Sequence, residues 1–489
     1  MNTPVRRIAI AVMVMILLLM ANLTYVQVVK ASDYRNDPRN QRVLIAEYSR
    51  QRGQISAEGQ VLASSVATDD RLQYLRQYPD GPTFAPVTGY YSMIYSSTGI
   101  ERSEDEVLNG SDDRLFVRRL SDLITGRDPS GGNVVLTIDP AVQERAYAEL
   151  TDRGYAGAVV ALRPQTGEIL AMVSTPSYDP NRLASHNAAE QTEAYGEFDD
   201  EDPPVLINRA ISETYPPGST FKLIDTAAAL NAGFTPDSQL TADAEITLTG
   251  TNTTLQNFAG TRCGTGATAS LRDALARSCN TAFAELAATL GEDRLREQAQ
   301  AFGIGTAAPS IPLPVASSSL GEIPDVAALQ QSGIGQRDVR MTPLQNAMVV
   351  AAIANGGEVM APYLVKEIQG ADLEPITVTE PDRLGRAIDP AVARTLTDLM
   401  IGAENRTGGG GQIPGVQIAA KTGTAEHGAD PKTTPPHNWY VAFAPAENPQ
   451  VAVAVLVENG GDRSLEATGG SRAAPIGRAV IGEALRSAQ

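Results

Sequence analysis

An uninterrupted apolar run lies close to the N-terminus of the chain. No charged residue occurs among the 22 residues from Ile8 to Val29, and Ile8 to Ala21 is entirely apolar. A helix of that length extends about 33 Å, which is enough to cross a bilayer. A cleaved signal peptide is the alternative, because small residues flank Lys30, although the preceding stretch is long and bulky for a cleavage region. We therefore expect a transmembrane anchor at residues 8–29 that follows a cytoplasmic tail of residues 1–7.

The segment after the anchor is polar and follows a different pattern. Lysine and arginine lie on both sides of the apolar run, so their count does not settle its orientation. Large domains cross membranes largely regardless of such charges, so we expect the bulk of the chain to be extracytoplasmic. Residues 30–130 are rich in charge and turn residues, with short strands indicated at Arg52–Ile55 and Leu62–Ala63. We expect an N-terminal pedestal domain here, with a flexible linker as the alternative.

From residue 131 onwards the pattern indicates a larger folded domain. Single strands are indicated at Val134–Ile138 and Val416–Ala420, and paired apolar runs indicate two hairpins. The hairpin strands are Ala156–Leu162 with Glu168–Ser174, and Trp439–Ala444 with Val451–Val457. Helices are indicated from Asp139 or Pro140, at Lys222–Leu230, at Ser270–Leu290 and at Ala473–Ala488. The pattern predicts an α+β domain at 131–489, in which an antiparallel sheet from both ends of the domain is covered by helices and carries an inserted helical lobe.

Charge and composition exclude several kinds of partner and cofactor. Lysine plus arginine number 39 and aspartate plus glutamate number 57, which gives a net charge of −18 and makes a nucleic-acid partner improbable. Two cysteines and three histidines cannot form a four-cysteine zinc site or a histidine-rich metal centre, so we expect no metal and no cofactor. Seven acidic residues at Glu190–Asp202 favour a solvated surface loop, with a functional acidic patch as the alternative.

The segment Tyr215–Lys222 is the most informative for chemistry. Two prolines and a glycine force a turn before an apolar helix, which places Ser219 in the first helical turn. Lys222 follows three residues later and therefore lies on the same helical face. A serine hydroxyl needs a base to become a nucleophile, and a lysine can be that base only if burial or a second cation keeps it neutral. A lone Ser-x-x-Lys match is weak, because a helix cap beside a surface lysine gives the same pattern.

Two further motifs strengthen this interpretation. Ser278 and Asn280 form a Ser-x-Asn motif inside the expected helical lobe, and Lys421 to Thr424 follows the expected strand Val416–Ala420. Each could be a helix cap or a strand end with a turn. Together, in this order, Ser-x-x-Lys, Ser-x-Asn and Lys-Thr-Gly are typical of penicillin-binding proteins and serine β-lactamases.

The chain resembles the class B, monofunctional penicillin-binding proteins, and most closely their actinobacterial members. The resemblance covers nearly the whole chain and includes Gly157–Asn181, Asn208–Lys222, Gly333–Gln336 and Met341–Pro343. The stretch Arg52–Ala63 departs from the family pattern, because it lacks an Asp-Arg pair and is one residue shorter. The resemblance implies the penicillin-binding transpeptidase fold, with a five-stranded antiparallel sheet, behind a transmembrane helix and a small β-rich pedestal.

The resemblance also implies a catalytic cycle for three of the residues. Ser219 would attack the penultimate D-Ala carbonyl of a peptidoglycan stem peptide and release the terminal D-Ala. Lys222 would be the base for that step, and Ser278 would relay protons to and from the amines. An amine of a neighbouring stem would then resolve the acyl-enzyme and complete the cross-link.

The remaining motif residues are implied in substrate binding. Asn280 would hold a substrate amide, Lys421 would supply positive potential, and Thr422 and Thr424 would bind the terminal carboxylate, with Gly423 between them. The backbone N–H groups of Ser219 and Thr424 would form the oxyanion hole. β-Lactam antibiotics are the expected inhibitors, and a polytopic glycan polymerase of the shape-elongation-division-sporulation type is the expected protein partner.

The two cysteines, Cys263 and Cys279, are separated by 16 residues. Closing a loop of that size stabilises the fold by about 3 kcal/mol on the entropic account. An oxidised pair fits an extracytoplasmic domain. We expect a disulfide that steadies Ser278 and Asn280, with two separate buried thiols as the alternative.

Rival functions use the same motifs. A serine β-lactamase needs a water-activating group, and no Glu-x-x-Leu-Asn occurs between Ser278 and Lys421. A D,D-carboxypeptidase would use water in place of the acceptor amine and stays open. A membrane-anchored β-lactam sensor needs a cytoplasmic output domain, and only seven residues precede the apolar run. A structural scaffold with an inactive site is disfavoured because all three motifs are complete.

Overall fold

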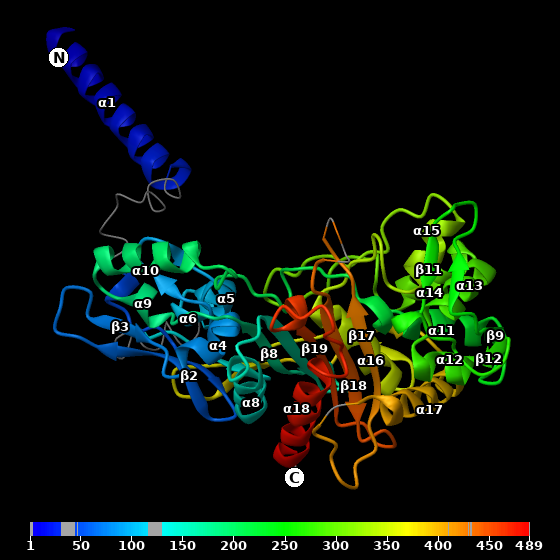
Figure 1. Cartoon of the computed structure of the whole chain (residues 1–489). Helices are drawn as coiled ribbons and strands as arrows, with labels where there is room; N and C mark the ends of the chain where they lie inside the picture. The colour runs from blue at the N-terminus through cyan, green and yellow to red at the C-terminus, as the bar shows by residue number, and fades with distance from the viewer. Residues whose placement is uncertain are drawn as a thin grey trace.

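A computed structural model describes residues 3–30, 45, 47–115, 130–408, 410–428, 430 and 433–488. The tail residues Met1 and Asn2 and parts of the expected pedestal, 31–44, 46 and 116–129, lie outside the described residues. The N-terminal apolar run forms one helix, made of α1 (Thr3–Thr24) and the π-helical turn η1 (Tyr25–Val29). It is 27 residues long and apolar enough to cross a membrane, and none of it is buried against the rest of the chain (Figure 1).

The large domain is built on the predicted five-stranded antiparallel sheet. Its order is β17-β18-β19-β7-β8, so strands from the two ends of the domain lie side by side. The strands are β17 (Ala419–Ala425), β18 (His437–Ala444), β19 (Val451–Val457), β7 (Gly157–Leu162) and β8 (Ile169–Thr175). Both faces of the three central strands are buried, which explains why β7, β18 and β19 appear as continuous apolar runs.

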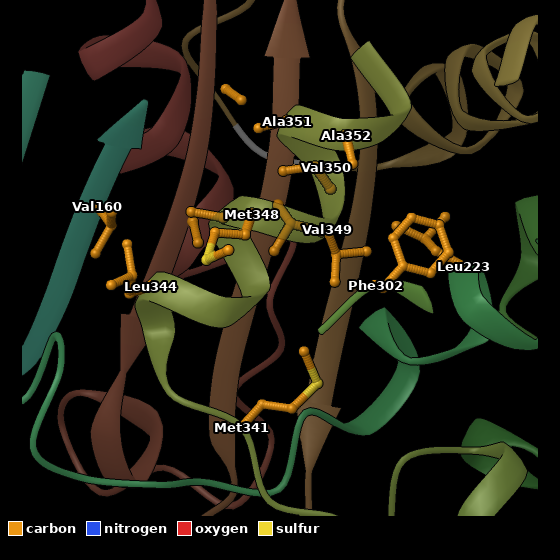
Figure 2. Close-up of a cluster of buried hydrophobic side chains, with 14 of the residues drawn as sticks. Val160, Leu223, Phe302, Met341, Leu344, Met348, Val349, Val350, Ala351 and Ala352 are labelled. Carbon is orange, nitrogen blue, oxygen red and sulfur yellow. The ribbon is translucent and has the colours of Figure 1, made fainter. Parts of the chain in front are cut away.

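Helices cover both faces of this sheet. The helices α8 (Pro140–Thr151) and α18 (Ala473–Ser487) pack together on one face. The other face is covered by α16 (Pro343–Ala354), which is buried along almost its whole length. Figure 2 shows Leu344 of α16 beside Val160 of β7, within the main hydrophobic core. The predicted layer arrangement is therefore confirmed.

The inserted lobe is mainly helical and lies at the β17 edge of the sheet (Figure 1). Its helices are α11 (Lys222–Asn231), α12 (Leu271–Arg277), α13 (Asn280–Leu290), α14 (Glu292–Ala301), α15 (Val326–Gly333) and α17 (Pro390–Arg406). Short ladders complete it: β9 (Gln239–Thr241) pairs with β12 (Thr268–Ser270), and β10 (Glu245–Thr247) with β11 (Thr254–Gln256). The helix α17 packs against both α12 and β17, so it joins the lobe to the sheet.

The pedestal is a six-stranded mixed sheet with small helices. Its order is β15-β14-β6-β1-β2-β3, and the β1–β6 pair is parallel. The strands are β1 (Ile55–Ala57), β2 (Gln60–Ala67), β3 (Tyr74–Gln77), β6 (Asn133–Leu136), β14 (Val365–Gln369) and β15 (Pro375–Val378). Two parts of the chain thus meet in one sheet, because β14 and β15 follow the helical lobe in sequence. The small helices are α4 (Gly81–Thr88), α5 (Gly99–Ser103), α6 (Asp105–Leu108) and α9 (Asn181–Ala184), and the short pair β4 (Tyr91–Ser92) and β5 (Ser96–Ser97) lies among them.

Three local predictions were wrong. Ser270–Leu290 is two helices, because Ser278 adopts the left-handed conformation (φ 60°, ψ 43°) and breaks the run. The strand expected at Val416–Ala420 begins at Ala419 and continues to Ala425, because its whole length pairs with β18. The acidic segment is the helix α10 (Ala188–Asp200), which begins at an Asn187 side-chain cap and buries one face; its acidic side chains are solvated.

Candidate active site

A tight turn presents Ser219 beside the edge of the central sheet. The turn is the 3₁₀ element η3 (Gly218–Thr220), which leads directly into α11. Trp439 donates its indole N–H to the Pro216 carbonyl oxygen at 3.0 Å and so fixes the turn to β18. A Cβ at Gly423 would lie 2.8 Å from the Pro217 carbonyl oxygen, so only glycine lets β17 pass this close to the turn.

Lys222 is completely buried, and three oxygen atoms surround its amine. Its Nζ lies 3.0 Å from Ser219 Oγ, 2.8 Å from the Ser278 carbonyl oxygen and 2.8 Å from Asn280 Oδ1. Burial lowers its pKa well below the ordinary value, and the charge of Lys421 lowers it further. A neutral amine has two N–H groups and one lone pair. The two carbonyl oxygens can only accept, so they take the two N–H groups, and the lone pair is left for the Ser219 hydroxyl.

The break between α12 and α13 brings Ser278 into contact with a second lysine. Lys421 Nζ donates to Ser278 Oγ at 2.8 Å and to the Thr422 carbonyl oxygen at 2.9 Å. Lys421 therefore links the helical lobe to the sheet edge. Burial lowers the pKa of Lys421 to about 7. Its charge thus depends on pH in the neutral range, which the sequence did not indicate.

Alternate side chains of β17 have different environments, as expected for a strand. Lys421 and Gly423 are buried, whereas Thr422 and Thr424 are partly exposed. The sheet order makes β17 an edge strand, so its outer side has no ladder partner within the described part of the chain and borders a cleft of about 1150 Å³. The cleft is lined by residues from all three motifs: Ser219, Ser278, Asn280, Lys421, Thr422 and Thr424. The three sequence-predicted motifs thus meet at one place.

The structure adds functional candidates that the motifs did not contain. Four arginines line the cleft, although the chain as a whole is strongly acidic: Arg277, Arg337, Arg340 and Arg406. Arg277 immediately precedes the Ser-x-Asn motif, Arg337 and Arg340 lie between the stretches Gly333–Gln336 and Met341–Pro343, and Arg406 ends α17. Asp225 lies one helical turn after Lys222, and its only sequence signal is an acid within an apolar, alanine-rich helix.

The predicted disulfide is present. Cys263 and Cys279 are bonded, with their Cα atoms 5.9 Å apart. The bond ties the loop after the 3₁₀ turn η4 (Phe258–Gly260) to the break between α12 and α13. Among the described residues, no group of three or more His, Cys, Asp or Glu side chains is placed to hold a metal ion.

Comparison with known proteins places the chain in a family. The family described as the penicillin binding protein transpeptidase domain matches residues 157–482, and the penicillin binding protein A dimerisation domain matches residues 52–134. The chain belongs to the penicillin-binding protein transpeptidase family.

Curated and solved relatives in this family are similar over nearly the whole chain. The peptidoglycan D,D-transpeptidase PbpA of Mycolicibacterium smegmatis is 60% identical, with 99% of each chain covered. Its namesake in Mycobacterium tuberculosis is 58% identical over the same shares. A solved structure of penicillin-binding protein A from M. tuberculosis, a ceftriaxone acyl-enzyme complex, has a TM-score of 0.89 and 58% identity, covering 90% of this chain and 100% of that one. The resemblance to actinobacterial penicillin-binding proteins and the predicted fold class are confirmed.

Proposed function

We propose that this chain is a peptidoglycan D,D-transpeptidase that acts through an acyl-enzyme on Ser219. The observation that carries the proposal is the arrangement around Lys222. The buried amine lies 3.0 Å from Ser219 Oγ, and two carbonyl oxygens occupy its N–H groups. The relatives described above are named peptidoglycan D,D-transpeptidases, and one was solved with a β-lactam bonded as an acyl-enzyme.

The first half-reaction transfers the acyl group to the enzyme. Lys222 Nζ takes the proton of the Ser219 hydroxyl while Oγ bonds to the penultimate D-Ala carbonyl carbon. The C–N bond to the terminal D-Ala then breaks, and the leaving amine takes up a proton through Ser278. Ser278 suits this relay because its Oγ accepts from Lys421 Nζ, which can replace the proton that the hydroxyl gives to the leaving amine. Lys222 keeps the Ser219 proton until Ser219 leaves in the second half-reaction, and the acceptor amine then returns a proton through Ser278 to Lys421.

The second half-reaction forms the cross-link. An acceptor amine bonds to the acyl carbon and gives up a proton along the same route, and Ser219 leaves with its hydroxyl restored. Thr422 and Thr424 project from the cleft edge of β17 and would bind the substrate carboxylate, with the charge of Lys421 behind them. The backbone N–H groups of Ser219 and Thr424 would stabilise the oxyanion. Asn280 would hold a substrate amide with its Nδ2 group, which donates to the Gln256 carbonyl oxygen at 3.0 Å.

Covalent labelling by a fluorescent penicillin tests the assignment of the nucleophile. Incubation of the detergent-solubilised chain, followed by digestion and mass spectrometry, should place the adduct on the peptide that contains Ser219. Ser219→Ala should abolish labelling, and Ser103→Ala, which changes an exposed serine of the pedestal, should leave it unchanged. A labelled peptide without Ser219 would contradict the proposal. Incubation with a stem pentapeptide and an acceptor amine then separates cross-linking from a D,D-carboxypeptidase reaction, which would release D-Ala without forming a dimer.

The anchor, the compartment and the partner are part of the same proposal. The helix Thr3–Val29 would anchor the chain in the cell membrane as a single pass, with the catalytic domain outside the cytoplasm. The disulfide supports this orientation, because such bonds persist in oxidising compartments. Protease added to spheroplasts should then degrade the large domain without lysis. A polytopic glycan polymerase as partner rests on the family resemblance alone, and co-purification of the full chain with such a protein would test it.

A further inference from the structure

A second carboxylic acid is buried beneath the catalytic residues and takes no part in the proposed reaction. Asp225 lies on α11, one turn after Lys222, and is completely buried. Neither of its carboxyl oxygens has a hydrogen-bond partner within the described part of the chain. Burial of an unpaired carboxylate is very unfavourable, so such a group is retained at a cost in stability.

The carboxyl group of Asp225 fits a space that the neighbouring helices leave open. A Cβ at Gly333, at the end of α15, would lie 3.2 Å from Asp225 Oδ2 and 2.4 Å from the Cβ of Ala287 on α13. Phe283, also on α13, places its ring 5.5 Å from Lys222 Nζ, and its backbone oxygen would lie 3.4 Å from the same Cβ at Gly333. The absence of a side chain at Gly333 therefore makes room for a carboxyl group between α13 and α15.

Charged groups on the surrounding elements do not compensate for Asp225. The helix α15 has no ionisable residue, and the one on α13, Glu285, is exposed. Burial raises the pKa of Asp225 well above its ordinary value, and the charge of Lys222 is the one opposing influence. The pKa of Lys222 is in turn lowered by burial and by the charge of Lys421, and raised by the charge of Asp225. The ionisable groups on the other packed helices α14 and α17 have no resolved effect on this pair: Glu292, Asp293, Arg294, Arg296, Glu297, Arg394, Asp398, Glu404 and Arg406.

We propose that Asp225 is a positioning residue for the transpeptidase reaction, which decides through its own charge whether Lys222 is a free amine. This proposal rests on the proposed function of Lys222 as the base for Ser219. The pair holds one proton in each of two forms with the same net charge. In the active form Asp225 is a neutral acid and Lys222 is an amine with its lone pair toward Ser219. In the dormant form the carboxyl O–H bond is broken, Lys222 has gained an N–H bond, and the ammonium group can no longer accept the serine proton.

The two forms make a specific prediction for the pH profile of acylation. A carboxylate near Lys222 stabilises the ammonium group. In the wild type, part of the population therefore keeps Lys222 protonated as the pH rises through the acidic limb of the rate profile. Removal of that carboxylate leaves only the effects of burial and Lys421 on Lys222, and both of these lower the lysine pKa. The acidic limb of the profile should therefore move to lower pH.

The test compares Asp225→Asn with the wild-type full chain in detergent, using the second-order rate of fluorescent penicillin acylation between pH 4 and 9. Asparagine keeps the size of the side chain and removes its charge. We expect the midpoint of the acidic limb to fall by about 1 pH unit or more. At one pH unit below the wild-type midpoint, the rate of the variant, divided by its own plateau rate, should be about fivefold higher than the same ratio for the wild type. The plateau rate of the variant should be equal to that of the wild type or lower, because its Lys222 is a weaker base. Thr226→Val is the matched control, because it alters a buried, uncharged neighbour on the same helix and should not move the limb.

The outcomes separate this proposal from the proposed function. Coincident acidic limbs, with or without a lower plateau or lower melting temperature, would show that Asp225 has a structural role only and would overturn the proposal. If Asp225→Asn does not fold, Asp225→Ser removes the same charge with a smaller side chain and is subject to the same criterion. An adduct on a residue other than Ser219 would instead overturn the proposed function, and the Asp225 proposal with it.

Discussion

Two groups of buried ionisable side chains in this chain differ in their protonation: one is held ionised by charged partners, and the other is driven toward its neutral form. In the pedestal, Glu101 is fully buried between two arginines: its carboxylate accepts from Arg52 Nε at 2.7 Å and from Arg76 Nε at 2.6 Å. Tyr78 donates its hydroxyl to the same carboxylate at 3.1 Å. Burial alone would raise the pKa of Glu101, but the charges of Arg76 and Arg52 outweigh it, and the pKa is lowered. The pedestal acid is therefore ionised and fully paired.

The buried groups at the cleft have no such pairing. Burial lowers the pKa values of Lys222 and Lys421 and raises that of Asp225, so all three are driven toward their neutral forms. The difference lies in the partners and not in the depth of burial. Charge-assisted hydrogen bonds from two arginines, one to each carboxylate oxygen, keep Glu101 ionised. Carbonyl and hydroxyl partners instead leave an amine able to gain or lose a proton. The same low-dielectric burial thus stabilises structure in one region and creates a reactive base in the other.

The largest expected effect comes from breaking the pairing in the pedestal. Glu101→Gln keeps the side-chain size but leaves two buried arginines without their counter-charge. The free energy of unfolding should fall by about 3–5 kcal/mol, as for other buried pairs that lose one partner. Chemical denaturation monitored by circular dichroism would measure it.

The matched control for this variant is Glu197→Gln, which breaks the exposed ion pair with Arg182. Exposed pairs contribute little to stability, so this change should have little effect on the free energy of unfolding. Equal losses for Glu101→Gln and Glu197→Gln would contradict the assignment of the pedestal cluster as a structural ion pair. Folded Glu101→Gln protein should also acylate at an undiminished rate, since neither Glu101 nor its arginine partners line the cleft.

The next effect tests the reactive side of the comparison. Lys222→Arg places a permanent cation at this position and removes any accessible neutral form, because guanidinium does not deprotonate in proteins. The rate of penicillin acylation should fall by at least about 100-fold, the lower range for loss of a general base. Stopped-flow labelling of the purified variant would measure it, with melting temperature as the check on folding. Acylation within a few-fold of the wild-type rate would show that lysine is not the base.

The sequence predicted those strands and site residues that are marked by a local pattern of residues. The apolar runs of β7, β18 and β19 indicated buried strands, and the three motifs indicated a serine site, because each motif is local and chemically distinctive. The prediction of one helix across Ser270–Leu290 was wrong, because apolar spacing continues through Ser278, whereas that residue adopts a left-handed turn in which its Oγ accepts from Lys421 Nζ. Local periodicity carries no information about such a contact across 143 residues.

The residues that the sequence missed depend on packing between distant segments. Asp225 appears as an isolated acid on an apolar helix, and its importance follows only from Gly333, which leaves space for it between two other helices. The full extent of β17 was likewise missed, since Thr422 to Ala425 is extended because it pairs with β18. The joining of β14 and β6 in the pedestal sheet also requires a pairing between segments more than 200 residues apart.

The smallest expected effect is a pH dependence of stability that distinguishes the two regions. The folded chain loses the proton of Lys421 near pH 7, whereas an unfolded lysine keeps its proton up to about pH 10.4. Between these values the unfolded state binds more protons, so the free energy of unfolding should rise with pH, by up to about 1.4 kcal/mol per pH unit for this lysine. Lys421→Met removes the titrating group, so denaturation curves at pH 7, 8 and 9 should show a shallower rise than for the wild type. Glu101→Gln should lower the stability but leave this rise with pH unchanged. The lowered pKa of Glu101 means that its stabilisation is complete above the unfolded glutamate pKa of about 4.3 and is lost only as the pH falls through the folded value. Its loss should therefore be the same at pH 7, 8 and 9.

Parallel slopes for the wild type and Lys421→Met would mean that Lys421 remains charged in the folded chain. The contrast between a paired and an unpaired buried charge would then not apply to that residue.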